Sequence, residues 1–328
     1  MESVIHQEFV KNIRKAILNK EMAVMKFEKD QVVSILTDIL CLGREAVYRR
    51  LRGEVKFSLE EVSLIALKLD ISIDSLLGLK SKEKSVIELN FLDPNGFIKQ
   101  YHAKIKEYIH LFETMNEKYG DISILSAFDK LPYTQYLHHK NLAKFRLYKW
   151  AYQMNALKRV PFNEFTMPEE VVQSQVKFVS TIRKIKEYTL VLSPNIFSSF
   201  IKDLKYFREL NLLTDEDVLI LKNELIAVLA EGETLAITGG FTPNNYINIY
   251  ISDLDFSFSN MLFTFDRHYY TYINVYDVGG IESQNETLCK YQAKWITAIQ
   301  RYSKLISGSN EIERHRFFEQ QRQIINGI

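Results

Sequence analysis

The residues best suited to contact another molecule stand together between Arg44 and Lys56. This stretch contains five arginines and lysines against two glutamates, although the formal net charge of the whole chain is only +1. Arginine pairs with phosphate or, through two hydrogen bonds, with guanine, and glutamate can accept a hydrogen bond from the amino group of cytosine. Because the chain as a whole has no basic field, any affinity for nucleic acid has to come from this local patch.

Two short amphipathic helices are expected to position these residues. Apolar residues recur at helical spacing from Val32 to Leu40, and the pattern ends near Cys41–Gly43. Helical spacing resumes over residues 44–52, where Val47 and Leu51 share one face and the basic residues point away from it. Two short helices joined by a turn, the second with a basic outer face, have the geometry that places a helix in the major groove of DNA.

Further signals delimit the helices on both sides of this pair. Apolar positions predict a leading helix over residues 2–18, and Gly53 can supply the positive φ that ends the second helix of the pair. Ser58 and Glu61 have the spacing of a capping box, which predicts that another helix starts at Ser58. Ser72 can cap a last short helix that carries Leu76.

With these signals in this order, the stretch resembles the Cro/phage-repressor-type (XRE) helix-turn-helix family. The resemblance extends over residues 4–77 at most and rests on Leu36–Leu40, Val47-x-x-x-Leu51-Arg52-Gly53, Ser58–Glu60 and Leu69–Leu77. Cys41 stands at a turn position where the family commonly has glycine. The resemblance implies a lambda-repressor-like domain whose recognition helix, residues 44–52, reads double-stranded DNA.

The resemblance and the outward-facing positions together select six residues for DNA contact. They are Arg44, Glu45, Tyr48, Arg49, Arg52 and Lys56. A module of this size touches few base pairs, so specific binding usually joins two half-sites, about 34 Å apart, in a symmetric dimer. We therefore expect a homodimeric regulator, while the competing interpretation is that the arginines are ordinary solvated surface.

Length and composition predict two globular domains. The chain has 328 residues, of which 46% are hydrophobic and 25% charged. We place a helix-turn-helix domain at residues 1–79, a linker at 80–95 and a C-terminal oligomerisation or effector domain at 96–328. Cys41 and Cys289 have neither disulfide nor metal spacing, and no apolar run is long enough to span a bilayer. These features favour a cytoplasmic protein without a membrane partner.

The C-terminal domain is predicted to be rich in helix. Helical periodicity dominates residues 96–232, and two closing helices are expected over residues 286–325. Between them, in residues 233–280, the period changes from 3.6 to 2, which predicts a small antiparallel sheet. The expected fold class is therefore mainly α, with a lambda-repressor-like domain followed by a larger helix-rich domain that contains this small sheet.

No motif in the C-terminal domain indicates catalysis. Asp253 and Asp255 could hold a divalent ion, but aspartates after a strand are more often turn formers. His138 and His139 would project to different sides of a helix, which is poor geometry for shared coordination. We therefore expect no metal and no cofactor, and we do not expect an enzyme.

Tyrosines are the remaining candidates for ligand contact in the C-terminal domain. Tyr250, Tyr270, Tyr272 and Tyr276 alternate along the predicted strands and could form the wall of a pocket for a small-molecule or peptide effector. They could equally cover the sheet where helices pack on it. The preferred hypothesis is a sequence-specific DNA-binding regulator, and the alternative is a ligand- or peptide-responsive interaction scaffold whose C-terminal domain carries the main activity.

Overall fold

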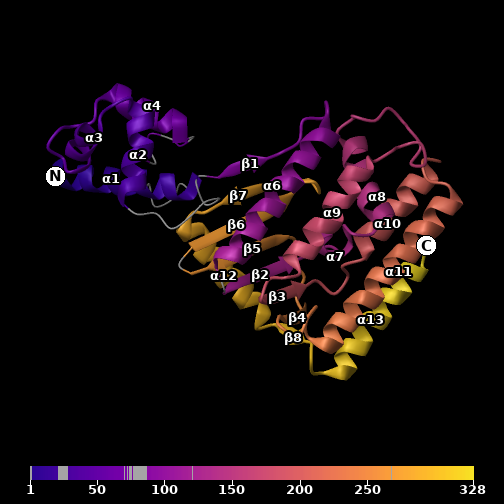
Figure 1. Cartoon of the computed structure of the whole chain (residues 1–328). Coiled ribbons are helices and arrows are strands. Elements are labelled where there is room, and N and C mark those ends of the chain that lie inside the picture. Colours follow the sequence, from indigo (N-terminus) through magenta and orange to yellow (C-terminus); the bar gives the residue numbers. More distant parts are fainter. Residues whose placement is uncertain are drawn as a thin grey trace. The chain divides into compact units, whose positions relative to one another are not determined.

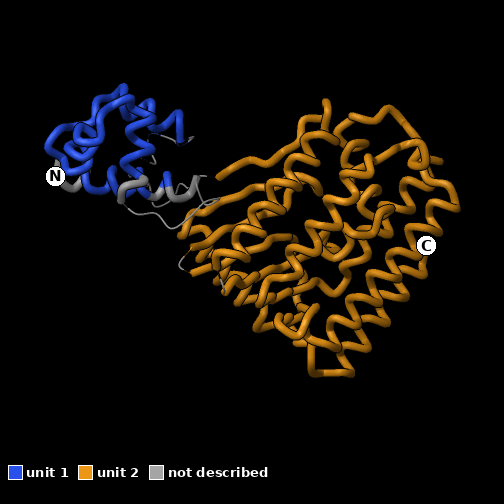
Figure 2. Tube along the Cα trace, viewed as in Figure 1, with its two compact units in different colours: residues 1–86 blue, residues 87–328 orange. Residues whose placement is uncertain are grey.

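The chain forms two compact units, residues 1–86 and residues 87–328 (Figure 2). The computed structural model describes residues 2–20, 29–69, 71, 73, 76, 87–119, 121–266 and 268–328. Each unit has its own hydrophobic interior and is described by itself.

The first unit is a small helical domain. Its helices are α1 (Glu2–Lys20), α2 (Lys29–Leu40), α3 (Arg44–Leu51) and α4 (Leu59–Leu69) (Figure 1). These helices meet in one apolar core, which contains Ile13, Ile17, Leu36, Val47, Ile65 and Leu76, all of them fully buried. The predicted leading helix and the two helices on either side of Cys41–Gly43 are therefore confirmed as elements of this core.

Local hydrogen bonds fix the start of α4 as predicted. The backbone N–H of Glu61 donates to the Ser58 hydroxyl over 3.2 Å, and the Ser58 N–H donates to the Glu61 carboxylate over 3.0 Å. Gly53 has φ +82°, and a Cβ there would come within 3.1 Å of the His6 ring. The predicted helix after Ser72 falls largely outside the described residues.

The second unit is built on a sheet of eight strands. The strands are β1 (Glu88–Asn90), β2 (Ile122–Phe128), β3 (Glu187–Leu192), β4 (Tyr246–Ser252), β5 (Asn260–Phe265), β6 (His268–Val275), β7 (Gly279–Ser283) and β8 (Ser303–Leu305). Their order is β1-β7-β6-β5-β2-β3-β4-β8, with parallel pairing of β2 with β3 and of β3 with β4. The remaining pairs are antiparallel.

The expected fold class, mainly α with a small antiparallel sheet, was wrong, because the second unit is built on a large mixed sheet. Two of its inner strands, β2 and β3, lie in the region predicted to be helical. They are short apolar runs covered on both faces, so they lack the alternation that marks a half-exposed strand. The first of the two expected closing helices, predicted over residues 286–305, ends at Gln300, and β8 follows at the edge of the sheet.

Helices cover both faces of this sheet (Figure 1). They are α6 (Phe97–Lys118), α7 (Tyr133–Tyr136), α8 (Lys140–Gln153), α9 (Glu169–Ile182), α10 (Ser198–Glu209), α11 (Asp215–Thr238), α12 (Glu286–Gln300) and α13 (Glu311–Asn326). On one face α6 stacks Phe112 against Phe263 of β5, with ring centroids 4.9 Å apart. On the other, Ile296 of α12 packs against Ala127 and Val191.

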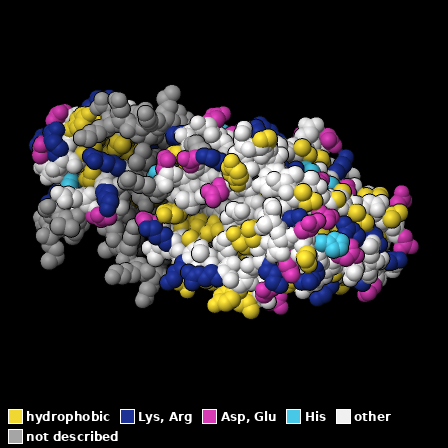
Figure 3. Space-filling view, turned by 90° about the horizontal axis from the view of Figure 1, so that it is seen from below, with side chains coloured by type: hydrophobic (Ala, Val, Ile, Leu, Met, Phe, Trp, Pro, Cys, Tyr) yellow, Lys and Arg dark blue, Asp and Glu magenta, His cyan; other side chains and the backbone are white. Residues whose placement is uncertain are grey.

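Charge on the second unit is mixed. On the face seen in Figure 3, acidic and basic side chains are interspersed with hydrophobic ones. This distribution agrees with the near-zero formal net charge of the chain. On that face the unit presents no extended basic surface of the kind that follows a nucleic-acid backbone.

Candidate functional site

The outer face of α3 carries most of the residues selected for DNA contact. Val47 is fully buried and anchors the helix in the core, and Gly43 caps it in an extended conformation. The side chains of Arg44, Glu45, Arg49, Arg52 and Lys56 are exposed. Tyr48 is half-buried and packs against the core of the unit. The structure thus brings five of the six residues to the surface, in or just after one short helix.

Carboxylates of the same unit pair with two of these arginines. Arg52 lies 2.6 Å from Glu54 and 3.0 Å from Glu45, and Arg49 lies 3.4 Å from Glu54. These side chains are about half exposed or more, so the pairs contribute little to stability. Glu54 nevertheless has a lowered pKa, because its hydrogen bond to Arg52 outweighs the small cost of desolvation. Glu54, which the sequence did not single out, is the residue that both arginines share.

A more buried pair fixes α3 to α4. Arg50 donates from Nε to both oxygens of Glu61 over 3.0 Å, and from Nη1 to the Ala46 carbonyl over 3.1 Å. The two side chains are only 17% and 16% exposed. Burial raises the pKa of Glu61, but the hydrogen bonds from Arg50 and Ser58 outweigh it and leave this pKa lowered. One carboxylate therefore both caps α4 and bonds a side chain of α3.

The turn before α3 begins in an unusual backbone conformation. Cys41, directly after α2, has φ +51°, in the left-handed region that glycine adopts most easily. Its side chain is exposed and makes only a long contact, 3.8 Å, from the thiol to the Asp38 carbonyl. The position where the family commonly has glycine is therefore one that favours glycine in this chain too.

The four tyrosines selected for ligand contact do not form one wall. Tyr250 packs with Trp295 on the α12 side of the sheet, whereas Tyr270 and Tyr272 are buried beneath the helices of the opposite face. Tyr276 is 70% exposed, and its ring lies 5.5 Å from that of Phe91. The structure therefore separates these residues, and of the four only Tyr272 lines the cavity described next.

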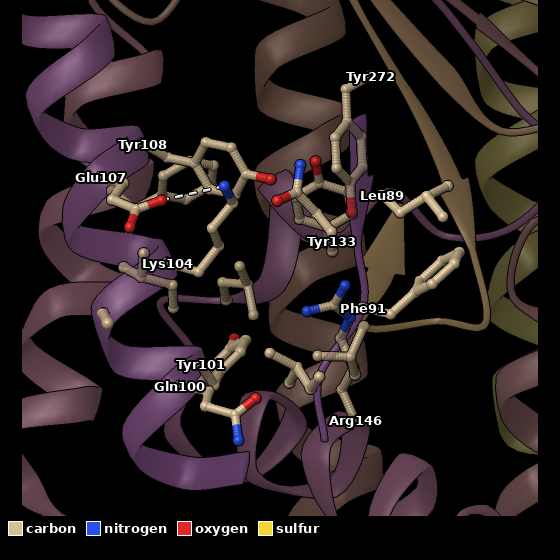
Figure 4. A pocket seen from close by; sticks show the side chains of 17 residues that line it. Leu89, Phe91, Gln100, Tyr101, Lys104, Glu107, Tyr108, Tyr133, Arg146 and Tyr272 are labelled. Carbon is tan, nitrogen blue, oxygen red and sulfur yellow. Dashed lines mark hydrogen bonds and ion pairs between the residues drawn. The ribbon is translucent and has the colours of Figure 1, made fainter. Parts of the chain in front are cut away.

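Tyr272 borders a cavity of about 340 Å³ in the second unit (Figure 4). Strand β1, helices α6, α7 and α8, and strand β6 all contribute to its wall. The side chains that face it include Phe91, Tyr101, Lys104, Tyr133, Arg146 and Tyr272. Sequence reasoning missed Tyr101, Tyr133 and Arg146, because they lie on three different helices and share no local pattern.

His138, His139 and Glu231 form a compact group with metal-ligand chemistry. Their ligand atoms lie within 4.8 Å of one another, because both histidines precede α8 rather than lying in it. The expectation that they point apart was therefore wrong. Nε2 of His138 and of His139 lie 2.9 and 3.0 Å from Glu231 oxygens, and Arg183 donates to the same carboxylate over 3.2 Å.

The surroundings of Glu231 argue against a cation there. A guanidinium already neutralises this carboxylate, and a metal ion would sit beside that positive charge. Desolvation raises the pKa of Glu231, but hydrogen bonds from His138 and His139 outweigh it and lower this pKa strongly. Asp253 instead pairs with Lys304 over 3.3 Å, and no cluster of potential ligands in the described part of the chain includes it or Asp255.

Comparison with known proteins gives one match. Residues 9–89 match the family described as BetR domain, a helix-turn-helix type of domain in regulators, and the match covers less than half of the chain. It points to DNA binding and transcription regulation in coarse terms. No curated protein and no solved structure matches the chain. None of the helices described by the structure is long and apolar enough to cross a membrane.

Proposed function

We propose that the protein is a sequence-specific DNA-binding transcriptional regulator that inserts α3 into the major groove, as in the Cro/phage-repressor-type family. The observation that carries the proposal is the division of α3 into two faces. Val47 is fixed in the core while Arg44 and Arg49 are exposed on a helix of eight residues. The match to the BetR domain supports the coarser part of the proposal, a DNA-binding regulator.

The side chains of α3 suggest how contacts would be distributed. Arg44 belongs to the first turn of α3, the part of a recognition helix that contacts base edges in this geometry. Arg49 and Arg52 would exchange their bonds to Glu54 for bonds to guanine or phosphate. The exchange costs little, since the existing pairs are exposed to water and screened by salt.

A homodimer is part of the proposal. A helix of eight residues reaches only a few bases, so one unit alone gives limited discrimination between sites. Two copies related by a twofold axis would read two half-sites separated by about one helical turn of DNA. The proposal covers DNA binding alone and includes no catalytic step.

The test is selection of genomic fragments by the purified protein at near-physiological salt. The native protein should enrich a short, palindromic site, and the double variant Arg44→Ala/Arg49→Ala should not. A control with the same loss of charge, Lys11→Ala/Lys68→Ala, removes exposed lysines of α1 and α4 and should retain the site. Failure of the native protein to enrich any site would reject the proposal, and so would equal enrichment by the Arg44/Arg49 variant.

A second candidate function has one observation in its favour, the cavity of the second unit. In this alternative, residues 87–328 bind a ligand or peptide as an interaction scaffold and the first unit only tethers them. The same selection experiment separates the two functions. Absence of an enriched site, together with ligand binding by the full chain, would favour the scaffold.

A further inference from the structure

The cavity on the α6 side is lined by a buried positive charge that forms no ion pair with the described residues. Arg146 of α8 is 7% exposed, and its guanidinium lies 4.8 Å from the Tyr133 ring centroid. Its Nη2 donates to the Asp277 carbonyl oxygen. None of the ion pairs formed by the described residues involves Arg146, whereas Lys149, three residues later, lies 2.8 Å from both Asp203 and Asp277.

Such a charge is costly to bury unless something compensates it. Tyrosines surround Arg146, but burial raises the pKa of Tyr133 and Tyr272, so their hydroxyls stay neutral. In Figure 4 the guanidinium extends into the space between Tyr101, Tyr133 and Phe91. A negatively charged group in the cavity would therefore lie beside this guanidinium and stabilise its charge.

A buried amide donor without a partner belongs to a residue in the wall of the same cavity. The side-chain Nδ2 of Asn90, on β1, is buried and finds no acceptor among the described residues, and Asn90 lines the cavity together with Arg146. A guanidinium and an amide N–H are the donors that a carboxylate accepts from. Buried donors are normally satisfied in a folded protein, so the Asn90 amide indicates an acceptor that the described residues do not supply.

The other charges of the wall are already matched. Lys104 lies 3.0 Å from Glu107, so the charges of these two side chains neutralise each other. Glu282 is buried and accepts a hydrogen bond from Tyr108, but it does not itself line the cavity. Arg146 bonds no carboxylate among the described residues, and the nearby Asp277 carboxylate, with which it interacts electrostatically, is already paired with Lys149. Arg146 can therefore balance one negative charge rather than two.

The rest of the lining is apolar or aromatic. Phe91, Ile105, Leu137, Phe178 and Val278 line the cavity beside the tyrosines. A volume of about 340 Å³ lies within the usual range for small-molecule sites. We propose that this cavity binds a small organic monocarboxylic acid with a hydrocarbon or aromatic body, and that Arg146 and Asn90 hold its carboxylate.

The position of β1 gives this ligand a regulatory role, which rests on the proposed function. Strand β1 pairs with β7 over only three residues, and Leu89 and Phe91 beside this pairing are 62% and 44% exposed. A ligand held by Asn90 would stabilise this short edge strand. Because β1 is the first element after residue 86, the ligand would act on the segment of chain that leads from the DNA-binding unit.

The experiment is calorimetric titration of the purified full chain, without DNA, with phenylacetate, benzoate and octanoate. Benzyl alcohol and 1-octanol serve as the uncharged controls, and inorganic phosphate serves as the inorganic anion control. At least one of the carboxylates should bind saturably, and the controls should not. Arg146→Met should weaken that binding by about 10- to 100-fold, the range expected for loss of a charge-assisted pair. Lys104→Met, which removes the cation already paired with Glu107, should weaken it by less than about threefold.

Two further variants keep the test decisive if Arg146→Met fails to fold. Asn90→Leu removes the unpartnered amide at the sheet edge, and Ala103→Phe fills the cavity from α6 without touching a charge. Both should weaken binding. The proposal is overturned if no probe binds at 10 mM, if neutral analogues or phosphate bind equally, or if Asn90→Leu and Ala103→Phe bind like the native chain. A change in operator affinity on adding the bound acid tests the regulatory role separately, so failure of the DNA-binding proposal leaves the calorimetric result intact.

Discussion

Replacement of Glu54 by glutamine should increase affinity for DNA. Glu54 lies 2.6 Å from Arg52 and 3.4 Å from Arg49. It therefore forms ion pairs with two of the arginines proposed to contact the duplex. Its lowered pKa keeps it ionised at neutral pH, and its charge would also repel the phosphates. Glu54→Gln removes both effects at once while keeping the size of the side chain.

The expected gain follows from the nature of these pairs. Both are exposed, so each holds its arginine weakly, and release of the two arginines plus loss of one repulsive charge should raise affinity by about three- to tenfold at physiological salt. The logarithmic salt slope should become steeper by up to about one unit, since one more phosphate contact releases one more counterion. Thermal stability of the first unit should change little.

Fluorescence anisotropy with a labelled operator fragment, at several salt concentrations, measures both quantities. Glu60→Gln is the matched control, because it removes the same charge from the exposed first turn of α4, where Glu60 pairs with no arginine among the described residues. It should raise affinity by less than Glu54→Gln does. Equal gains would mean that only net charge matters, and a loss with Glu54→Gln would mean that Glu54 orients the arginines instead of competing for them.

Three further predictions concern stability. Cys41→Gly should stabilise the first unit by about 1 kcal/mol in thermal unfolding, because Cys41 has φ +51°, and Cys41→Ala should not. Arg50→Met should destabilise the same unit by roughly 2–3 kcal/mol, since it leaves the mostly buried Glu61 without its partner, and an unchanged midpoint would contradict this. Glu231→Gln should lower the melting temperature at pH 7. The difference should shrink as pH falls below about 4, because a carboxyl with a lowered folded pKa stabilises above its unfolded pKa and loses this effect in acid.

Local patterns predicted the helical unit well. The stripes that place Leu36 and Val47 in the core, and the capping box of Ser58 and Glu61, depend on residues a few positions apart in the chain. Such interactions are encoded by spacing, so the sequence alone is enough to find them. The same reasoning selected the exposed side chains of α3, whose role in DNA binding stays a prediction.

The sheet was predicted incompletely for a physical reason. The period-2 patterns of β4, β5 and β6 were readable, but β2 and β3 are covered by layers of helices on both faces. A strand in that environment has no polar face, and a short apolar run is equally compatible with a buried helix. What covers a strand is decided by elements far away in the chain, which a local window does not contain.

The sequence by itself determined the helices of the first unit, their caps and the charge of α3, since these follow from neighbours along the chain. Tertiary structure decided the rest. It joined Arg50 to Glu61 across 11 positions and His138 to Glu231 across 93. It also placed Arg146 and Asn90 on the wall of one cavity, where Arg146 forms no ion pair with the described residues. Whether a charge is compensated depends on every element packed around it, and only the folded chain brings those elements together.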